Sequence, residues 1–171
     1  MKTIIWLEDN PDSIEEYIEE IKEIYDNKLN IQIWDGIYKN DERGLTCIED
    51  FKYKIVKAIE NKSRIGEFIG AFILDVRITV DDLSQLGFPQ IKTEKGLKSG
   101  IQIARYYLRN EQGDSPLKDE FKDTPILFFT VAGGIADKFP WVRDEKQKYF
   151  FAEKRIEEDF DDIKKWLKQF T

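Results

Sequence analysis

The chain has 171 residues, 36% of them charged and 13% aromatic, which suits one globular domain with a substantial core and argues against disorder. Its formal net charge of −7 argues against a nucleic-acid partner, which needs a basic stripe, and against docking on an anionic membrane. The absence of histidine excludes histidine metal sites and Ser-His or Cys-His catalysis, and the single cysteine excludes an internal disulfide.

Targeting signals are not visible in the sequence. The N-terminus has no basic segment followed by an apolar stretch, and no apolar run approaches the length of a membrane span. We therefore expect a cytoplasmic protein without a membrane partner. Cys47 lies among apolar residues and is expected to be a buried thiol.

Short apolar runs alternate with amphipathic segments along the chain. Asn10 is predicted to cap the first helix, with Pro11 at its first position. Pro140 interrupts the segment 135–148, so a helix is poorly defined there. In chain order the prediction is a strand at 3–7, a helix from 11 to 25, a strand at 29–35, a helix at 45–60, a strand at 68–74, a helix at 97–108, strands at 125–130 and 149–152, and a helix at 156–170.

Two long connections interrupt this alternation. Residues 76–95 have no clear period and are long for a strand-to-helix connection, so we expect an enlarged loop that can lie over the preceding strand end. Residues 110–124 are polar and are predicted to form a surface loop. Continuous apolar strands alternating with helices predict an α/β fold, a doubly wound five-stranded parallel sheet covered on both faces, as a single domain over residues 1–171.

Chemically useful side chains follow several of the predicted strands. In doubly wound folds, sites lie beyond the carboxyl ends of the strands. This rule places Glu8, Asp9, Asp75, Thr130 and Lys154 at one edge of the sheet. Taken singly, Asp9 could cap a helix and Thr130 could be an ordinary strand residue. Together, carboxylates from two buried strands predict a divalent-metal or phosphoryl site.

These strand ends, in this order, resemble the receiver domain of bacterial two-component response regulators. The segment 100–109 also resembles the third helix of that family. The resemblance covers nearly the whole chain and implies a flavodoxin-like fold of the receiver type. Its four motifs are Leu7-Glu8-Asp9-Asn10, Leu74-Asp75-Val76-Arg77, Pro125-Ile126-Leu127-Phe128-Phe129-Thr130 and Phe151-Ala152-Glu153-Lys154.

The resemblance implies a role for each strand-end residue. Asp75 is the nucleophile that forms an acyl phosphate, a reaction open to carboxylates. Lys154 neutralises charge on the phosphoryl oxygens, and Thr130 hydrogen-bonds the phosphoryl group. Arg77 and Ala132 occupy positions that tune dephosphorylation. The residues assigned to Mg²⁺ are Glu8, Asp9, Asp75 and Arg77.

The function implied is a stand-alone receiver in a two-component phosphorelay. A histidine kinase or phosphotransfer protein donates the phosphoryl group, and the phosphorylated form changes its affinity for a downstream protein partner. Three features depart from the family: Val131, Arg155 and the long connection after Asp75. They favour the alternative of a receiver-like interaction module that is not phosphorylated. A Mg²⁺-dependent phosphohydrolase or nuclease is a third alternative, although Arg77 stands where the haloacid-dehalogenase type has a second aspartate.

Overall fold

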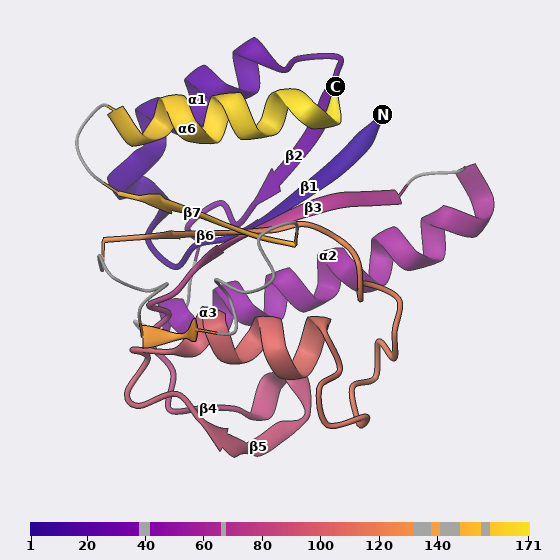
Figure 1. The fold of residues 1–171 in the computed structure, drawn as a ribbon, viewed down its shortest axis with the longest axis vertical. Coiled ribbons are helices and arrows are strands. Elements are labelled where there is room, and N and C mark those ends of the chain that lie inside the picture. Colours follow the sequence, from indigo (N-terminus) through magenta and orange to yellow (C-terminus); the bar gives the residue numbers. More distant parts are fainter. Residues whose placement is uncertain (38–41, 66–67, 132–137, 141–147, 155–157) are drawn as a thin grey trace.

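A parallel sheet forms the centre of the computed structural model (Figure 1), which describes residues 1–37, 42–65, 68–131, 138–140, 148–154 and 158–171. Its strand order is β2-β1-β3-β6-β7, and every pair of neighbours is parallel. This is the flavodoxin-like order, so the predicted doubly wound sheet is confirmed. The strands are β1 (Lys2–Leu7), β2 (Leu29–Ile33), β3 (Phe68–Asp75), β6 (Ile126–Thr130) and β7 (Tyr149–Glu153).

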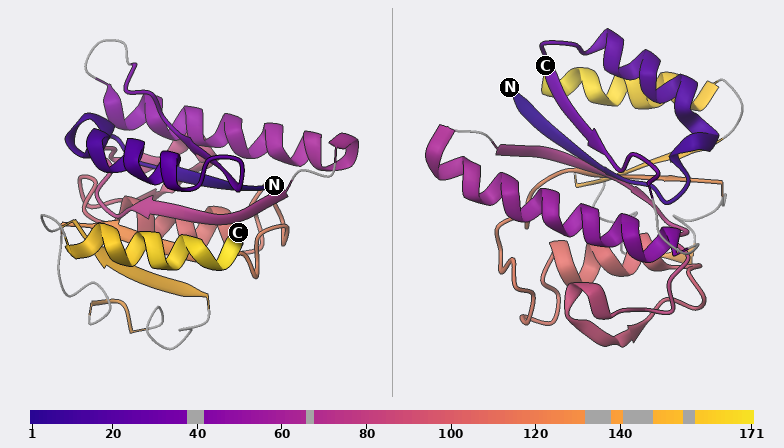
Figure 2. Two further views of the ribbon diagram at one scale, coloured as in Figure 1. Left: turned by 90° about the horizontal axis from the view of Figure 1, so that it is seen from above. Right: turned by 180° about the vertical axis from the view of Figure 1, so that it is seen from behind.

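Helices cover both faces of this sheet, as Figures 1 and 2 show from three directions. Strand side chains alternate between the faces: Ile4 and Trp6 join the core on one face, whereas Ile5 and Leu7 join the core on the other. The first face carries the 3-10 helix η1 (Pro11–Ile14), α1 (Glu15–Ile24), α6 (Glu158–Leu167) and the 3-10 helix η4 (Lys168–Phe170). The second carries α2 (Arg43–Ile65), α3 (Ser99–Gln102) and its π-helical continuation η3 (Ile103–Leu108).

The register of the strands brings their carboxyl ends to one edge. Leu7 pairs with Leu74, so Glu8 and Asp75 follow adjacent positions on β1 and β3. On the other side, Asp75 pairs with Phe129. Thr130 pairs with Glu153, and this places Lys154 one residue beyond the end of β7. The edge predicted to carry the site therefore exists.

The connection after β3 is folded rather than irregular. It contains β4 (Asp82–Leu83), the 3-10 helix η2 (Ser84–Leu86) and β5 (Phe88–Lys92), and β4 and β5 pair in antiparallel fashion. Leu83, Leu86 and Phe88 are buried in the same core as α2 and α3. Figure 1 shows this hairpin beside α2 and α3. Apolar side chains hold the hairpin on that helical face, whereas the first residues of the connection lie at the strand ends, where Thr79 N–H donates to Asp9.

Several local predictions also need correction. Asn10 occupies the position before η1, but its side chain caps nothing and instead accepts a hydrogen bond from Arg43 Nη1 at 2.8 Å. Ile24 and Leu97 are exposed, although both lie at the helical spacing of apolar residues in the segments predicted to be helices. The segment 135–148, where the sequence defines no clear helix, lies mostly outside the described residues. No helix in the described ranges has the length and apolar character needed to cross a membrane.

The polar connection 110–124 is better anchored than its composition predicts. Leu117 and Phe121 are buried against the core. Arg109 fastens the connection, since its guanidinium donates to the carbonyl oxygens of Phe121 and Thr124. Cys47 is buried, as predicted.

Candidate functional site

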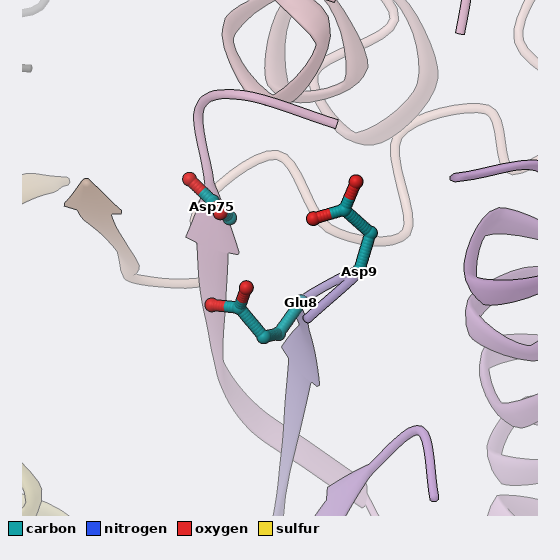
Figure 3. A group of neighbouring side chains, drawn as sticks. All are labelled: Glu8, Asp9 and Asp75. Carbon is teal, nitrogen blue, oxygen red and sulfur yellow. The ribbon is translucent and has the colours of Figure 1, made fainter. Parts of the chain in front are cut away.

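Three carboxylates lie together at the carboxyl ends of β1 and β3 (Figure 3). Glu8 and Asp9 follow β1 directly, and Asp75 is the last residue of β3. One oxygen from each carboxylate lies within 4.8 Å of the other two. Glu8 is only 1% exposed and Asp75 5% exposed, whereas Asp9 is half-buried. The sheet register thus converts two distant segments of sequence into one acidic cluster.

Lys154 completes the cluster with a positive charge. Its Nζ lies 2.6 Å from Glu8 Oε2 and 2.5 Å from Asp75 Oδ2. The ammonium also lies over the Phe129 ring, 5.4 Å from its centroid, where a cation is favoured. The Lys154 main-chain N–H donates to the Thr130 carbonyl oxygen at 2.8 Å, which extends the β6–β7 pairing by one residue. Backbone and side chain together therefore fix this lysine between the two buried carboxylates.

Each carboxylate also accepts a hydrogen bond from the main chain. Asn10 N–H donates to Glu8 Oε1 at 3.2 Å, and Arg77 N–H donates to Asp75 Oδ1 at 3.1 Å. Asp9 Oδ2 accepts from Thr79 N–H, also at 3.1 Å. The sequence did not reveal these donors, because any residue other than proline supplies a main-chain N–H.

The electrostatics of the cluster favour one extra proton. Burial, and next the nearby Asp75 carboxylate, raise the pKa of Glu8 from 4.5 to about 8, although Lys154 acts in the opposite direction. Burial also raises the pKa of Asp9. Burial disfavours the charged form of Lys154, yet Glu8 and Asp75 outweigh it, and the pKa of this lysine is raised. Near neutral pH the free cluster thus contains a lysine cation and a proton on Glu8.

The donor set fits a hard divalent cation. Carboxylate oxygens are preferred ligands of Mg²⁺, and Glu8, Asp9 and Asp75 can each offer one. Arg77 is different, because a guanidinium cannot ligate a cation and only its carbonyl oxygen could serve. The exposed Arg77 side chain instead lines an open pocket of about 540 Å³ together with Asp9 and Thr79. The structure therefore gathers three of the four predicted side chains.

The remaining predicted residues lie on or directly after β6 and β7, or outside the described ranges. Thr130, the last residue of β6, is 2% exposed. Val131 follows it and is 61% exposed, so its side chain does not fill the interior of the site. Phe151 is half-buried and packs on Phe128 with ring centroids 5.6 Å apart. Ala132 and Arg155 are outside the described residues.

Comparisons with known proteins give no family. No model of a protein family matches the chain, and no curated protein matches it.

Proposed function

We propose that this chain is a receiver domain that accepts a phosphoryl group on Asp75 and passes the signal to a protein partner. The observation that carries the proposal is the contact between Lys154 Nζ and Asp75 Oδ2, at 2.5 Å, beside the carboxylates of Glu8 and Asp9. A nucleophilic carboxylate, a fixed cation and a divalent-cation donor set are the groups that phosphoryl transfer to aspartate requires.

The proposed reaction is a direct transfer to Asp75. A carboxylate oxygen of Asp75 attacks the phosphorus of a phosphohistidine on a donor protein, a histidine kinase or a phosphotransfer protein. The new O–P bond forms as the P–N bond breaks, and the electron pair of that bond stays on the imidazole nitrogen. Lys154 balances the negative charge of the phosphoryl oxygens. Thr130, at the end of the neighbouring strand β6, donates its hydroxyl to the phosphoryl group.

Glu8, Asp9 and Asp75 are the residues that would hold Mg²⁺ in this proposal. When bound, the ion supplies additional positive charge against the phosphoryl oxygens. The chain itself keeps the three carboxylates close, orients them through main-chain donors and excludes water from Glu8 and Asp75.

Phosphorylation with acetyl phosphate and Mg²⁺ tests the assignment. The wild-type chain is expected to gain one acid-stable, base-labile phosphoryl group, detected by intact-protein mass spectrometry, with acetate as the leaving group. Asp75→Asn is expected to remain unlabelled. Asp81→Asn removes an exposed carboxylate on the same connection and is expected to label like the wild type. Persistent labelling of Asp75→Asn would overturn the assignment.

One observation favours a second candidate, a receiver-like interaction module that is not phosphorylated. Asp75 is 5% exposed, and its two oxygens already accept hydrogen bonds, one from Lys154 and one from Arg77 N–H. A phosphoryl donor must displace or share these contacts to reach the nucleophile. In this alternative the lysine and the carboxylates serve only to hold the strand ends together.

Tryptophan fluorescence separates the two candidates. Trp6 lies two residues before Glu8 and packs edge-on against Phe129, at 5.7 Å between centroids. The Phe129 ring in turn lies beneath Lys154, so ligands that move the lysine should change the Trp6 signal. A saturable response to Mg²⁺ followed by beryllofluoride supports the receiver. Absence of both responses, together with absence of labelling, supports the passive module.

A further inference from the structure

We propose that residues 75–79 act as a rigid positioning segment, in which the main-chain N–H of Thr79 orients Asp9. The segment would thereby prepare the cluster for its cation before any ligand arrives. This inference relies on the proposed function for its purpose, but its geometry can be tested without it.

Two donors from this one segment reach carboxylates on two different strands. Arg77 N–H donates to Asp75 at the end of β3, and Thr79 N–H donates to Asp9 beyond the end of β1. Arg77 and Thr79 are themselves exposed. Main-chain donors on an unsupported exposed stretch would not hold a carboxylate in one orientation. The segment therefore needs support from elsewhere in the fold.

Two helices provide this support through glycines that approach the segment closely. A Cβ atom on Gly44, in the first turn of α2, would lie closer than 3.0 Å to the Thr79 carbonyl oxygen. A Cβ on Gly100, in α3, would come equally close to the Asp75 carbonyl oxygen. Gly100 N–H also donates to the Val76 carbonyl oxygen at 3.1 Å. Both ends of the segment are thus packed against helix backbone with no room for a side chain.

Buried hydroxyl groups fix the rest of the segment and its continuation into the hairpin. Ser99 Oγ donates to the Ile78 carbonyl oxygen at 2.6 Å, and Thr93 Oγ1 donates to the Val80 carbonyl oxygen. The Ile78 side chain is fully buried. In the long connection after β3, the hairpin is therefore packed on the helices and fixes the C-terminal side of the segment. The first residues of the connection donate hydrogen bonds to the carboxylates.

Amide hydrogen exchange of the wild-type protein, followed by NMR without Mg²⁺, is the first test. The N–H groups of Thr79 and Arg77 are expected to exchange about tenfold or more slowly than in an unstructured chain, the factor that a hydrogen bond to a charged group supplies. In Asp9→Ala, Thr79 is expected to lose its protection while Arg77 keeps it. Unprotected Thr79 in the wild type, or unchanged protection in Asp9→Ala, would overturn the proposal.

Glycine variants provide the second test, with Mg²⁺ affinity measured by intrinsic tryptophan fluorescence. Groups that orient metal ligands typically contribute about 10–100-fold in affinity, so Gly44→Ala and Gly100→Ala are each expected to weaken Mg²⁺ binding at least about tenfold. Gly70→Ala, on the same strand as Asp75, is the control, because the atoms nearest to its Cβ would belong to the Lys2 side chain, from 3.0 Å, and not to a main-chain carbonyl. Alanine is the better helix former, so a loss at Gly44 reports the contact and not helix propensity.

The two proposals fail in different ways. Wild-type affinity in Gly44→Ala, with an unchanged fold by circular dichroism, contradicts the positioning segment. If the wild type binds no Mg²⁺ and gains no phosphoryl group, the proposed function fails, and Thr79 exchange in the wild type and in Asp9→Ala still decides the positioning role. Variants that do not fold leave that wild-type measurement intact.

Discussion

Replacement of Glu8 by glutamine should remove much of the pH dependence of this protein's stability. Glu8 is buried between Lys154 and Asn10 N–H, and its pKa is raised from 4.5 to about 8. Glutamine keeps the length of the side chain and an oxygen acceptor but cannot ionise. The substitution therefore isolates the proton on Glu8 from the packing around it.

The sign of the effect follows from where each state releases its proton. Unfolded Glu8 releases it near pH 4.5 and folded Glu8 near pH 8, so between these values the folded state binds more protons. Raising the pH then favours unfolding: the contribution is complete below about pH 4.5 and lost by about pH 8. At 1.36 kcal/mol per pKa unit, the loss is on the order of 5 kcal/mol. That is a large part of a typical folding free energy of about 5–15 kcal/mol.

Urea denaturation followed by tryptophan fluorescence measures this loss. In a chelating buffer, the free energy of unfolding of the wild type should fall by several kcal/mol between about pH 5 and pH 8, whereas Glu8→Gln should lose much less. Burial also raises the pKa of Asp9, which adds a slope of the same sign to both proteins. A flat wild-type profile, or equal slopes in the two proteins, would refute the reasoning.

Two further experiments test the buried residues Lys154 and Cys47. Lys154→Met leaves Glu8 and Asp75 without their cation. Because breaking a buried pair costs about 3–5 kcal/mol, the free energy of unfolding, measured in urea at neutral pH, should fall by that amount. The control Lys165→Met, at an exposed lysine, should change it by less than about 0.5 kcal/mol. Cys47 is 1% exposed and burial raises the pKa of its thiol, so iodoacetamide should modify it only after unfolding. Rapid alkylation of the folded protein, read by mass spectrometry, would contradict this burial.

The sheet and the cluster were largely predictable because both depend on apolar runs. A parallel strand buried on both faces is a continuous apolar segment, as in 68–74, so its position and direction can be read locally. Once the strands are parallel, their carboxyl ends share an edge, and the residues that follow them come together. Glu8, Asp75 and Lys154 were placed by this rule alone, and the structure brings all three within ion-pair distance.

Features made by tertiary contacts were not predictable. The apolar residues of the hairpin follow neither a strand nor a helix period, because two short strands flank a 3-10 turn. Asn10 has the sequence signature of a helix cap, yet its side-chain oxygen accepts a hydrogen bond from Arg43, 33 residues away in the sequence. The donor from Thr79 to Asp9 has no signature at all, because it belongs to the main chain.

Charge balance in the cluster explains why a site of this kind is stable without a ligand. Three carboxylates within 4.8 Å would repel one another strongly if each were ionised and unpaired. Lys154 offsets part of that repulsion. The raised pKa of Glu8 means that this carboxyl binds a proton, which removes the negative charge that the lysine alone does not offset. A cation that binds these oxygens must therefore compete with the lysine and release that proton. Under the proposed function, the lysine freed from Glu8 is then available to a phosphoryl group on Asp75, so the contact that stabilises the free protein also supplies the cation for the reaction.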